Sequence, residues 1–129
     1  NANFLLNTGP MPDGQLQPES IKSFAEIGKW MRVYGESIHG TRGGPVMPRP
    51  WGVTTQKGNV VYVHILDWKD SVLVVPVAGV TDAHLLIDGS RIATQMVGEG
   101  IALTLPLTQL QAPDTVIKLT LAAKPSAAQ

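Results

Sequence analysis

The stretch NFLLN, residues 3–7, decides how the first part of this protein is interpreted. It is a short apolar run between polar residues, typical of a strand that is buried on both faces of a parallel sheet. Residues 8–14 follow with the sequence TGPMPDG, which is dense in turn-forming residues. We therefore expect a strand over residues 3–7 that leads through a long turn into the next element.

That next element is predicted to be a helix from Pro18 to about Gly35. Proline suits the first turn of a helix, where its missing N–H is not needed, and Glu19 lies near the positive end of the helix dipole. Apolar residues recur at three- and four-residue spacing, as on the buried face of an amphipathic helix: Ile21, Phe24, Ala25, Ile27, Gly28, Trp30, Met31 and Tyr34. Residues 1–35 thus predict one βα unit.

A single βα unit is not a complete fold. A parallel strand needs strands beside it and helices over its faces, and no later segment of the sequence predicts another βα unit. We therefore expect the chain to be the C-terminal part of a longer protein whose upstream part contains the missing partners. The alternative is that the strand joins the following sheet in a small α+β domain.

The second part of the sequence predicts a β-sandwich. Residues 45–58 are rich in glycine and proline and are expected to be a linker. Short β-branched and apolar runs follow, and closely spaced strands of this kind are typical of an antiparallel sandwich over 59–122. A hairpin turn is predicted at 88–90 and another turn at 98–100, and residues 123–129 are expected to be a tail. The strands are expected at 59–67, 72–77, 83–87, 91–97, 101–105 and 115–121.

Composition narrows the classes of function. The 129 residues include ten basic and ten acidic side chains and no cysteine. The zero net charge does not favour a nucleic acid or an anionic membrane as a partner, and no apolar run approaches the roughly 20 residues of a membrane span. The absence of cysteine excludes disulfides, thiolate metal sites and cysteine nucleophiles.

Residues that could bind a metal or act as nucleophiles are few and scattered. His39, His64 and His84 are far apart and lack a ligand motif, so we expect no metal site and no cofactor. His64 and His84 lie within predicted strands, which favours hydrogen-bonded sheet positions. Ser90 lies in a predicted turn and outside any Gly-x-Ser-x-Gly motif.

Carboxylates and aromatic side chains allow a second interpretation. Asp13, Asp67 and Asp70 are the acids a glycosidase would use in a pair, although aspartate more often shapes turns and we favour that role here. Sugars also stack on exposed aromatic faces, and Trp51, Tyr62 and Trp68 are the candidates for such a platform. The alternative is that these aromatics pack in the core or against another domain.

An ordered set of strings resembles the end of the α-L-fucosidases of glycoside hydrolase family 29. The strings are NFLLNTGP at 3–10, PDG at 12–14, PE at 18–19, IGKW at 27–30, YGESIHGT at 34–41, WGVTTQKGN at 51–59, YVHILDW at 62–68 and LLIDG at 85–89. The resemblance runs from residue 1 to about residue 121. His39 departs from it, because the family more often has tyrosine there.

The resemblance implies a mainly β fold: an antiparallel β-sandwich preceded by the last βα unit of a (β/α)8-like barrel, with residues 1–44 as the last strand, loop and helix of that barrel. It also implies a parent enzyme that hydrolyses terminal α-L-fucosyl residues of glycans with retention, using two carboxylates. Both carboxylates belong to upstream strands and loops in the family. We therefore assign no catalytic residue to this chain and expect it to be inactive by itself, with the upstream barrel as its partner.

One site follows from the barrel geometry that the resemblance implies. Barrel active sites lie at the carboxyl ends of the strands, which places Asn7 and Thr8 at the rim of the fucose pocket. The competing interpretation is that Asn7 only shapes the turn. For the whole chain, the alternative is a free-standing carbohydrate-binding or structural β-sandwich module. Family resemblance suggests a secreted, periplasmic or lysosomal location.

Overall fold

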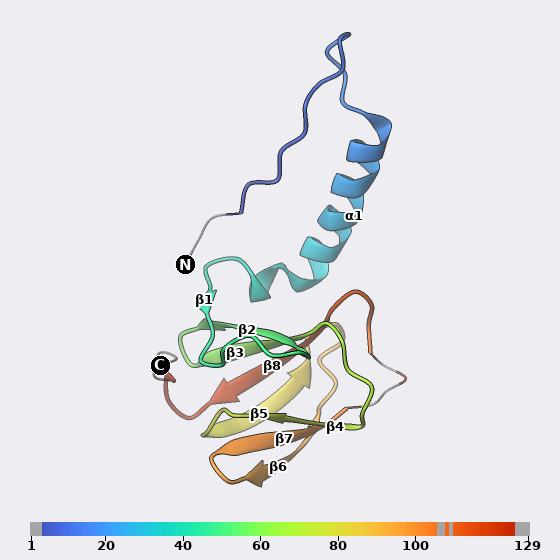
Figure 1. The fold of residues 1–129 in the computed structure, drawn as a ribbon. Helices are drawn as coiled ribbons and strands as arrows, with labels where there is room; N and C mark the ends of the chain where they lie inside the picture. Colours follow the sequence, from blue (N-terminus) through green and yellow to red (C-terminus); the bar gives the residue numbers. More distant parts are fainter. Residues whose placement is uncertain (1–3, 106–107, 109, 126–129) are drawn as a thin grey trace.

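The computed structural model describes residues 4–105, 108 and 110–125 and contains a helix standing on a β-sandwich (Figure 1). The helical elements are α1 (Pro18–Tyr34) and the short 3-10 helix η1 (Gly35–Ser37). The strands of the described part are β1 (Arg42–Gly43), β2 (Gly52–Lys57), β3 (Val60–Ile65), β4 (Val72–Val75), β5 (Val80–Leu85), β6 (Ala93–Val97), β7 (Gly100–Thr104) and β8 (Thr115–Leu121).

Helix α1 begins and ends where the sequence predicts. Pro18 occupies the first turn and Glu19 adds an acid near the positive helix end. The end differs in detail, because Gly35 keeps a right-handed conformation, with φ −57°, and the chain continues into η1. The chain then reverses at Gly40, where φ is +72°.

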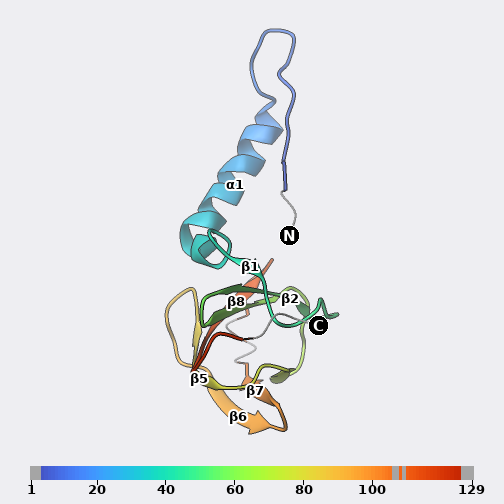
Figure 2. The same ribbon diagram turned by 90° about the vertical axis from the view of Figure 1, so that its left-hand side faces the viewer.

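The strand predicted over residues 3–7 does not form in the described part of that stretch, residues 4–7. Residues 4–10 are extended alongside α1 (Figures 1 and 2). The loop that leads from them to the helix is closed by a hydrogen bond from Met11 N–H to Gln15 O at 2.7 Å. The Phe4 and Leu5 side chains are 87% and 88% exposed. The physical reason is that a parallel strand exists only through hydrogen bonds to neighbouring strands, and none of the strands in the described part of the chain pairs with residues 4–7.

The predicted antiparallel sandwich is confirmed. One sheet has the order β1-β2-β3-β8-β5 and the other has the order β4-β7-β6, with every pairing antiparallel. The linker expected over 45–58 is wrong from Gly52 onward, because β2 pairs with β3 along its full length. Its β-branched residues Val53, Thr54 and Thr55 favour a strand, and the glycines on either side hid that signal.

The predicted hairpin turn at 88–90 forms, but its two strands separate after a single bridge. His84 and Arg91 pair there, after which β5 continues beside β8 and β6 beside β7 in the opposite sheet. The turn therefore serves as a corner between the two sheets. The second predicted turn does join two paired strands, β6 and β7, with Gly98 at φ +58°.

The core lies between the two sheets and is built by alternation along the strands. Inward-pointing side chains of both sheets are fully buried, and they include Val61, Val63, Leu73, Leu103, Ile117 and Leu119. The residues between them on β3, Tyr62 and His64, point to the outer face of the larger sheet. A second, smaller apolar cluster forms on that face beneath the end of α1. Within the described residues, no helix has the length and apolar character that crossing a membrane requires.

Candidate functional site at the helix–sandwich junction

Asn7 and Thr8, predicted at the rim of a pocket, lie on the arm that runs beside α1. Asn7 is exposed and Thr8 is partly buried. The Thr8 and Ser20 hydroxyl oxygens are hydrogen-bonded at 2.9 Å, which ties the start of the loop to the first turn of α1. The structure thus fixes Thr8 against the helix and leaves the Asn7 side chain facing solvent.

The candidate acids Asp13, Asp67 and Asp70 lie on two loops of the chain. Asp13 Oδ1 accepts a hydrogen bond from Gln15 N–H at 3.0 Å and so shapes its turn, as expected. Asp67 and Asp70 are exposed in the connection between β3 and β4. Asp88 shapes the corner turn, since the backbone N–H of Ser90 donates to its carboxylate at 2.9 Å and lowers its pKa.

The three histidines lie in different surroundings. His39 is exposed, His84 contacts Asp82 and the Gly89 carbonyl on the surface, and His64 is buried with Asp114. The His84 hydrogen bond lowers the pKa of Asp82. Among the residues that the structure describes, no three His, Cys, Asp or Glu side chains are grouped as a metal site would need.

The candidate aromatic platform is not formed. Trp51 is buried in the core between the sheets, whereas Tyr62 is buried on the opposite face of the larger sheet. Trp68 is partly buried against the core. These three rings therefore lie on two sides of one sheet and do not present a common exposed surface for a sugar.

The structure instead concentrates buried polar groups where the end of α1 and η1 meet the outer face of the larger sheet. We call this region the helix–sandwich junction, and its residues are Trp30, Tyr34, Glu36, Ser37, Thr55, Tyr62, His64, Asp114, Val116 and Lys118. Its apolar part is made by Tyr34, Tyr62 and Val116, all buried, with Trp30 packed beside them. The Trp30 and Tyr34 rings are tilted, with centroids 5.1 Å apart.

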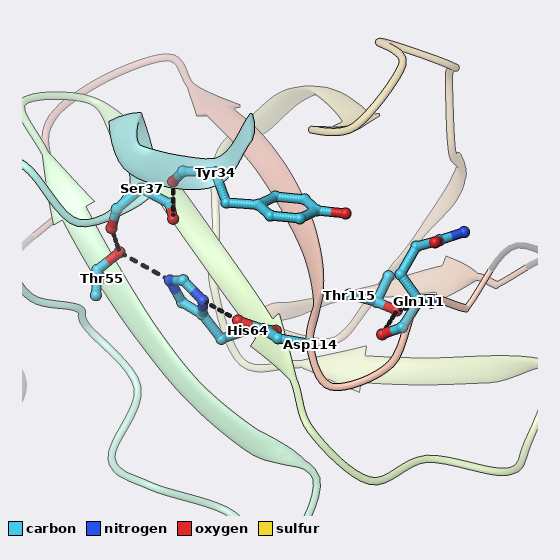
Figure 3. Close-up of polar contacts among 7 residues, drawn as sticks. All are labelled: Tyr34, Ser37, Thr55, His64, Gln111, Asp114 and Thr115. Carbon is cyan, nitrogen blue, oxygen red and sulfur yellow. Dashed lines mark hydrogen bonds and ion pairs between the residues drawn. The ribbon is translucent and has the colours of Figure 1, made fainter. Parts of the chain in front are cut away.

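A chain of hydrogen bonds runs through the junction (Figure 3). Ser37 Oγ–H donates to the Tyr34 carbonyl at 2.7 Å, and Thr55 Oγ1–H donates to the Ser37 carbonyl at 2.6 Å. His64 Nε2 lies 3.3 Å from Thr55 Oγ1, and His64 Nδ1 lies 2.7 Å from Asp114 Oδ2. The chain connects the end of α1 to β2, then to β3, and finally to the loop before β8.

The loop that presents Asp114 is itself fixed. Thr115 Oγ1 accepts a hydrogen bond from Gln111 N–H at 2.6 Å, which closes the loop just before β8 begins (Figure 3). Asp114 is buried together with His64. The loop is therefore tied to the start of β8, and the Asp114 carboxylate contacts His64 through Oδ2 and has no hydrogen-bond partner at Oδ1 among the described residues.

An ion pair crosses the junction at its solvent edge. Lys118 Nζ lies 2.9 Å from Glu36 Oε1, joining β8 to η1. The hydrogen bond to Glu36 raises the pKa of Lys118. Burial raises the pKa of Tyr62, and the nearby Glu36 charge raises it further. The pKa of Tyr34 is raised by burial and then by the charge of Asp114.

A groove of about 580 Å³ lies beside the junction, between α1 and the loops of the sandwich. Its lining is Glu26, Ile27, Lys29, Trp30, Leu66, Pro113 and Asp114.

Sequence reasoning missed the junction as a whole. The only signal was His64 in the middle of an apolar strand, because a histidine there needs buried partners; nothing in the spacing identified Ser37, Thr55 or Asp114 as those partners.

This chain is similar to known α-L-fucosidases. A family model described as alpha-L-fucosidase matches residues 1–36. The tissue alpha-L-fucosidase of Rattus norvegicus is 30% identical to this chain, over 81% of this chain and 24% of that protein. The tissue alpha-L-fucosidase of Mus musculus is 28% identical over 93% of this chain and 27% of that protein.

Solved structures agree with these relatives. The α-L-fucosidase isoenzyme 1 from Paenibacillus thiaminolyticus superposes with a TM-score of 0.82 at 35% identity, covering 92% of this chain and 30% of that one. A GH29 α-L-fucosidase from Bacteroides thetaiotaomicron gives a TM-score of 0.81 at 27% identity, covering 95% of this chain and 29% of that one. The chain thus spans about a quarter of the length of these curated relatives and under a third of these structures.

Proposed function

We propose that this chain, which corresponds to the C-terminal portion of the α-L-fucosidases of glycoside hydrolase family 29, completes and braces the catalytic barrel of such an enzyme. The parent would hydrolyse terminal α-L-fucosyl residues of glycans. The observation that carries the proposal is the superposition on a known α-L-fucosidase over 92% of the chain at 35% identity, which includes both the helical part and the sandwich.

The exposed apolar residues of the helical part support a role in completing a barrel. Phe4 and Leu5 are almost fully exposed beside α1, and Ile21, Phe24 and Ile27 are exposed along the helix. A strand in a closed barrel is covered by its neighbouring strands and by the helix that follows it. We therefore propose that an upstream part of the parent covers these side chains and supplies the strand partners of residues 4–7.

The helix–sandwich junction supports the bracing role. It connects the last turn of α1 to three strands of the larger sheet through apolar packing, hydrogen bonds and one ion pair. Groups held from several elements at once resist bending better than a single covalent connection. The sandwich is thus proposed to fix the closing helix of the barrel from outside the catalytic centre.

Catalysis itself is proposed to reside upstream. A retaining glycosidase needs two carboxyl groups about 5–5.5 Å apart on either side of the scissile bond. Asp13 is exposed on the loop before α1, Asp67 and Asp70 are exposed in the connection between β3 and β4, and Asp114 is buried against His64. We propose that none of these acids is one of the two catalytic carboxylates, so we expect the chain alone to be inactive.

Hydrolysis of a chromogenic aryl α-L-fucoside tests this proposal. The 129-residue chain should give no turnover above buffer, whereas the longer protein encoded by the same gene should cleave the substrate with retention, read by NMR of the first anomer released. A longer protein without fucosidase activity would overturn the proposal. Tight binding of a fucosylated oligosaccharide by the chain alone, measured by calorimetry, would favour the free-standing module instead.

We further propose that Asn7 and Thr8 lie at the rim of the parent's fucose pocket. They follow the residues that correspond to the last barrel strand, and barrel active sites lie at that end. Asn7 is the better contact, because the Thr8 hydroxyl is already bonded to Ser20. In the longer protein, Asn7→Ala should lower kcat/KM about tenfold, as expected when one hydrogen bond to substrate is lost. Gln15→Ala is the control from the same loop, and an unchanged kcat/KM in Asn7→Ala would remove Asn7 from the pocket.

A further inference from the structure

Strand β6 forms an open edge of the smaller sheet. The sheet has the order β4-β7-β6, and within the described residues no strand pairs with β6 on the side away from β7. All five residues of β6 are exposed. Met96 is 58% exposed even though its cross-strand partner Ile101 is buried in the core. An open strand edge presents unpaired N–H and C=O groups, to which another strand can add.

The outward backbone groups of this edge belong to Thr94 and Met96. A two-residue turn joins β6 to β7, and the pair that flanks such a turn, here Val97 and Gly100, is hydrogen-bonded. Hydrogen-bonded and non-hydrogen-bonded pairs then alternate along an antiparallel ladder. The backbone of Gln95 is therefore bonded to β7, whereas the N–H and C=O groups of Thr94 and Met96 point away from it.

The open edge begins directly after the corner between the two sheets. Ile92, two residues before Thr94, donates its N–H to the Ala83 carbonyl of β5 at 2.9 Å. This bond agrees with the alternation, because it also points away from β7. Beyond it, β5 and β6 belong to different sheets, so the edge is open along β6 itself.

The other sheet edges of the described part carry features that hinder the addition of a strand. β1 has two residues, one of them Arg42. β4 is preceded by Asp70 and followed by Pro76, and β5 contains Asp82 at a shift of register. Charges, proline, bulges and short strands are the usual protections of an edge. β6, with the sequence ATQMV and an unbroken register to β7, has none of them.

We propose that β6 pairs antiparallel with β6 of a second copy of this chain, across a two-fold axis at Gln95. Thr94 of each copy then lies opposite Met96 of the other, so the outward N–H and C=O groups of both residues are satisfied. Gln95 faces Gln95 of the second copy, and its side-chain amide can donate and accept at once. The Met96 side chain, exposed in a single chain, is covered by Thr94 of the second copy.

The charges on either side of β6 favour a second copy over an unrelated strand. Arg91 lies four residues before Gln95, and Glu99 lies four residues after it. In the two-fold register, Arg91 of each copy is therefore level with Glu99 of the other. The Arg91 side chain is 77% exposed and its contact with Asp82 is long, 3.4 Å from Nη2 to Oδ1. Glu99 forms no ion pair with another described residue, so both charges are available to pair across the axis.

This dimer would leave the helical part free. β6 lies at the end of the sandwich away from α1 (Figure 1), so the contact uses none of the side chains that an upstream barrel would cover. A single pair of strands buries little area, and small interfaces are weak. We expect a dissociation constant of about 0.1–1 mM, which makes the association reversible on dilution.

Dilution of the unaltered chain tests the pairing. Sedimentation equilibrium should give a mass well above that of a monomer at about 1 mM and the mass of a monomer at about 10 µM. In nitrogen–proton NMR spectra of the same series, the amides of Thr94 and Met96 should shift most. A monomer at every concentration would overturn the proposal. Shifts confined to residues 4–34 would also overturn it, because they would place the association on the helical part.

A matched pair of variants tests the edge. Met96→Lys places a charge where the strands pair and should weaken the association at least about tenfold. Met47→Lys is the control, because Met47 is 60% exposed but lies in the loop before β2, and it should leave the dissociation constant unchanged. Equal effects of the two variants would contradict pairing through β6.

Exchange of the flanking charges tests the register. Arg91→Glu and Glu99→Arg should each weaken the dimer about fivefold at low salt, because like charges then face each other at both ends of the strand pair. The double variant restores opposite charges and should recover the dissociation constant of the unaltered chain. Unchanged single variants, or a double variant that does not recover, would overturn the two-fold register and with it the choice of a second copy as partner. None of these measurements involves fucoside hydrolysis, so their outcome is independent of the proposed parent activity.

Discussion

The sandwich and the helical part of this chain differ in how much of their apolar surface they bury. The sandwich encloses its own core, where Val63, Leu103 and Ile117 are completely buried. The helical part leaves Phe4, Leu5 and most of α1 exposed, and in the part of the chain that the structure describes Tyr34, at the end of α1, is the one buried residue of this helix. Since buried apolar area is the main favourable term in folding, the sandwich carries the stability of the chain and the helical part depends on contacts outside itself.

The junction therefore joins a sandwich that has its own core to a helical part that depends on contacts outside itself. On one side, strands far apart in sequence are hydrogen-bonded into a closed core; on the other, a helix is local and contributes little without packing. Hydrogen bonds at the junction join η1, β2, β3 and the loop before β8. The ordered sheet therefore holds the end of the helix in place.

The largest effect is expected from a cavity in the sandwich core. Leu103→Ala removes a fully buried side chain and should lower the free energy of unfolding by about 3 kcal/mol in urea denaturation monitored by circular dichroism. Ile21→Ala, on the exposed side of α1, is the matched control and should change stability by less than about 0.5 kcal/mol. Equal losses in the two variants would contradict the idea that only the sandwich is self-contained.

A comparable effect is expected at Gly52, where β2 begins. Its φ is +149°, and a Cβ there would overlap the His64 carbonyl oxygen, a backbone atom that cannot move aside cheaply. Gly52→Ala should destabilise the chain by about 2–4 kcal/mol, measured by thermal unfolding. Gly43→Ala is the control, since a methyl group at that position would meet no atom within 4 Å beyond its chain neighbours, and it should leave the melting temperature nearly unchanged.

The strands of the sandwich differ in how well the sequence predicts them. Alternating and β-branched runs located β3, β4, β7 and β8 closely, because those strands carry the core and periodicity reports burial. The pattern failed for β2, where glycines and prolines surround only a few β-branched residues. It also failed for residues 4–7, because an apolar run predicts a buried strand only if partner strands are present.

The candidate site was less predictable than the fold. Turn chemistry correctly identified the role of Asp13, whose carboxylate accepts from Gln15. The junction could not be read from spacing, because Ser37, His64 and Asp114 meet only after β3 and β8 pair. Periodicity predicts which side of a strand a residue occupies, whereas the partner of a buried polar group depends on tertiary packing.

Alkaline pH should weaken the junction through its two tyrosines and its lysine. The pKa values of Tyr34, Tyr62 and Lys118 are all raised above their ordinary values of 10.0, 10.0 and 10.5. The folded chain therefore retains protons that the unfolded chain releases, so the associated stability is present below about pH 10 and is lost as the pH rises through the folded-state values. Urea unfolding as a function of pH should show stability falling above about pH 10, with a shallower fall in Tyr62→Phe. An identical slope in that variant would exclude Tyr62 as a contributor.

The smallest effect is expected from the ion pair that joins the two regions. Glu36 and Lys118 are 49% and 36% exposed, so solvent screens their attraction, and a double-mutant cycle with Glu36→Gln and Lys118→Met should give a coupling of about 0.5 kcal/mol or less. The Glu26–Lys29 pair, within α1 and more exposed, is the matched control. Because the first pair connects η1 to β8, its coupling should fall toward zero when Thr55→Val has removed the hydrogen bond to the Ser37 carbonyl, whereas the coupling of the control pair should remain. Persistence of the Glu36–Lys118 coupling in that background would mean that the ion pair holds η1 without help from the buried hydrogen bonds.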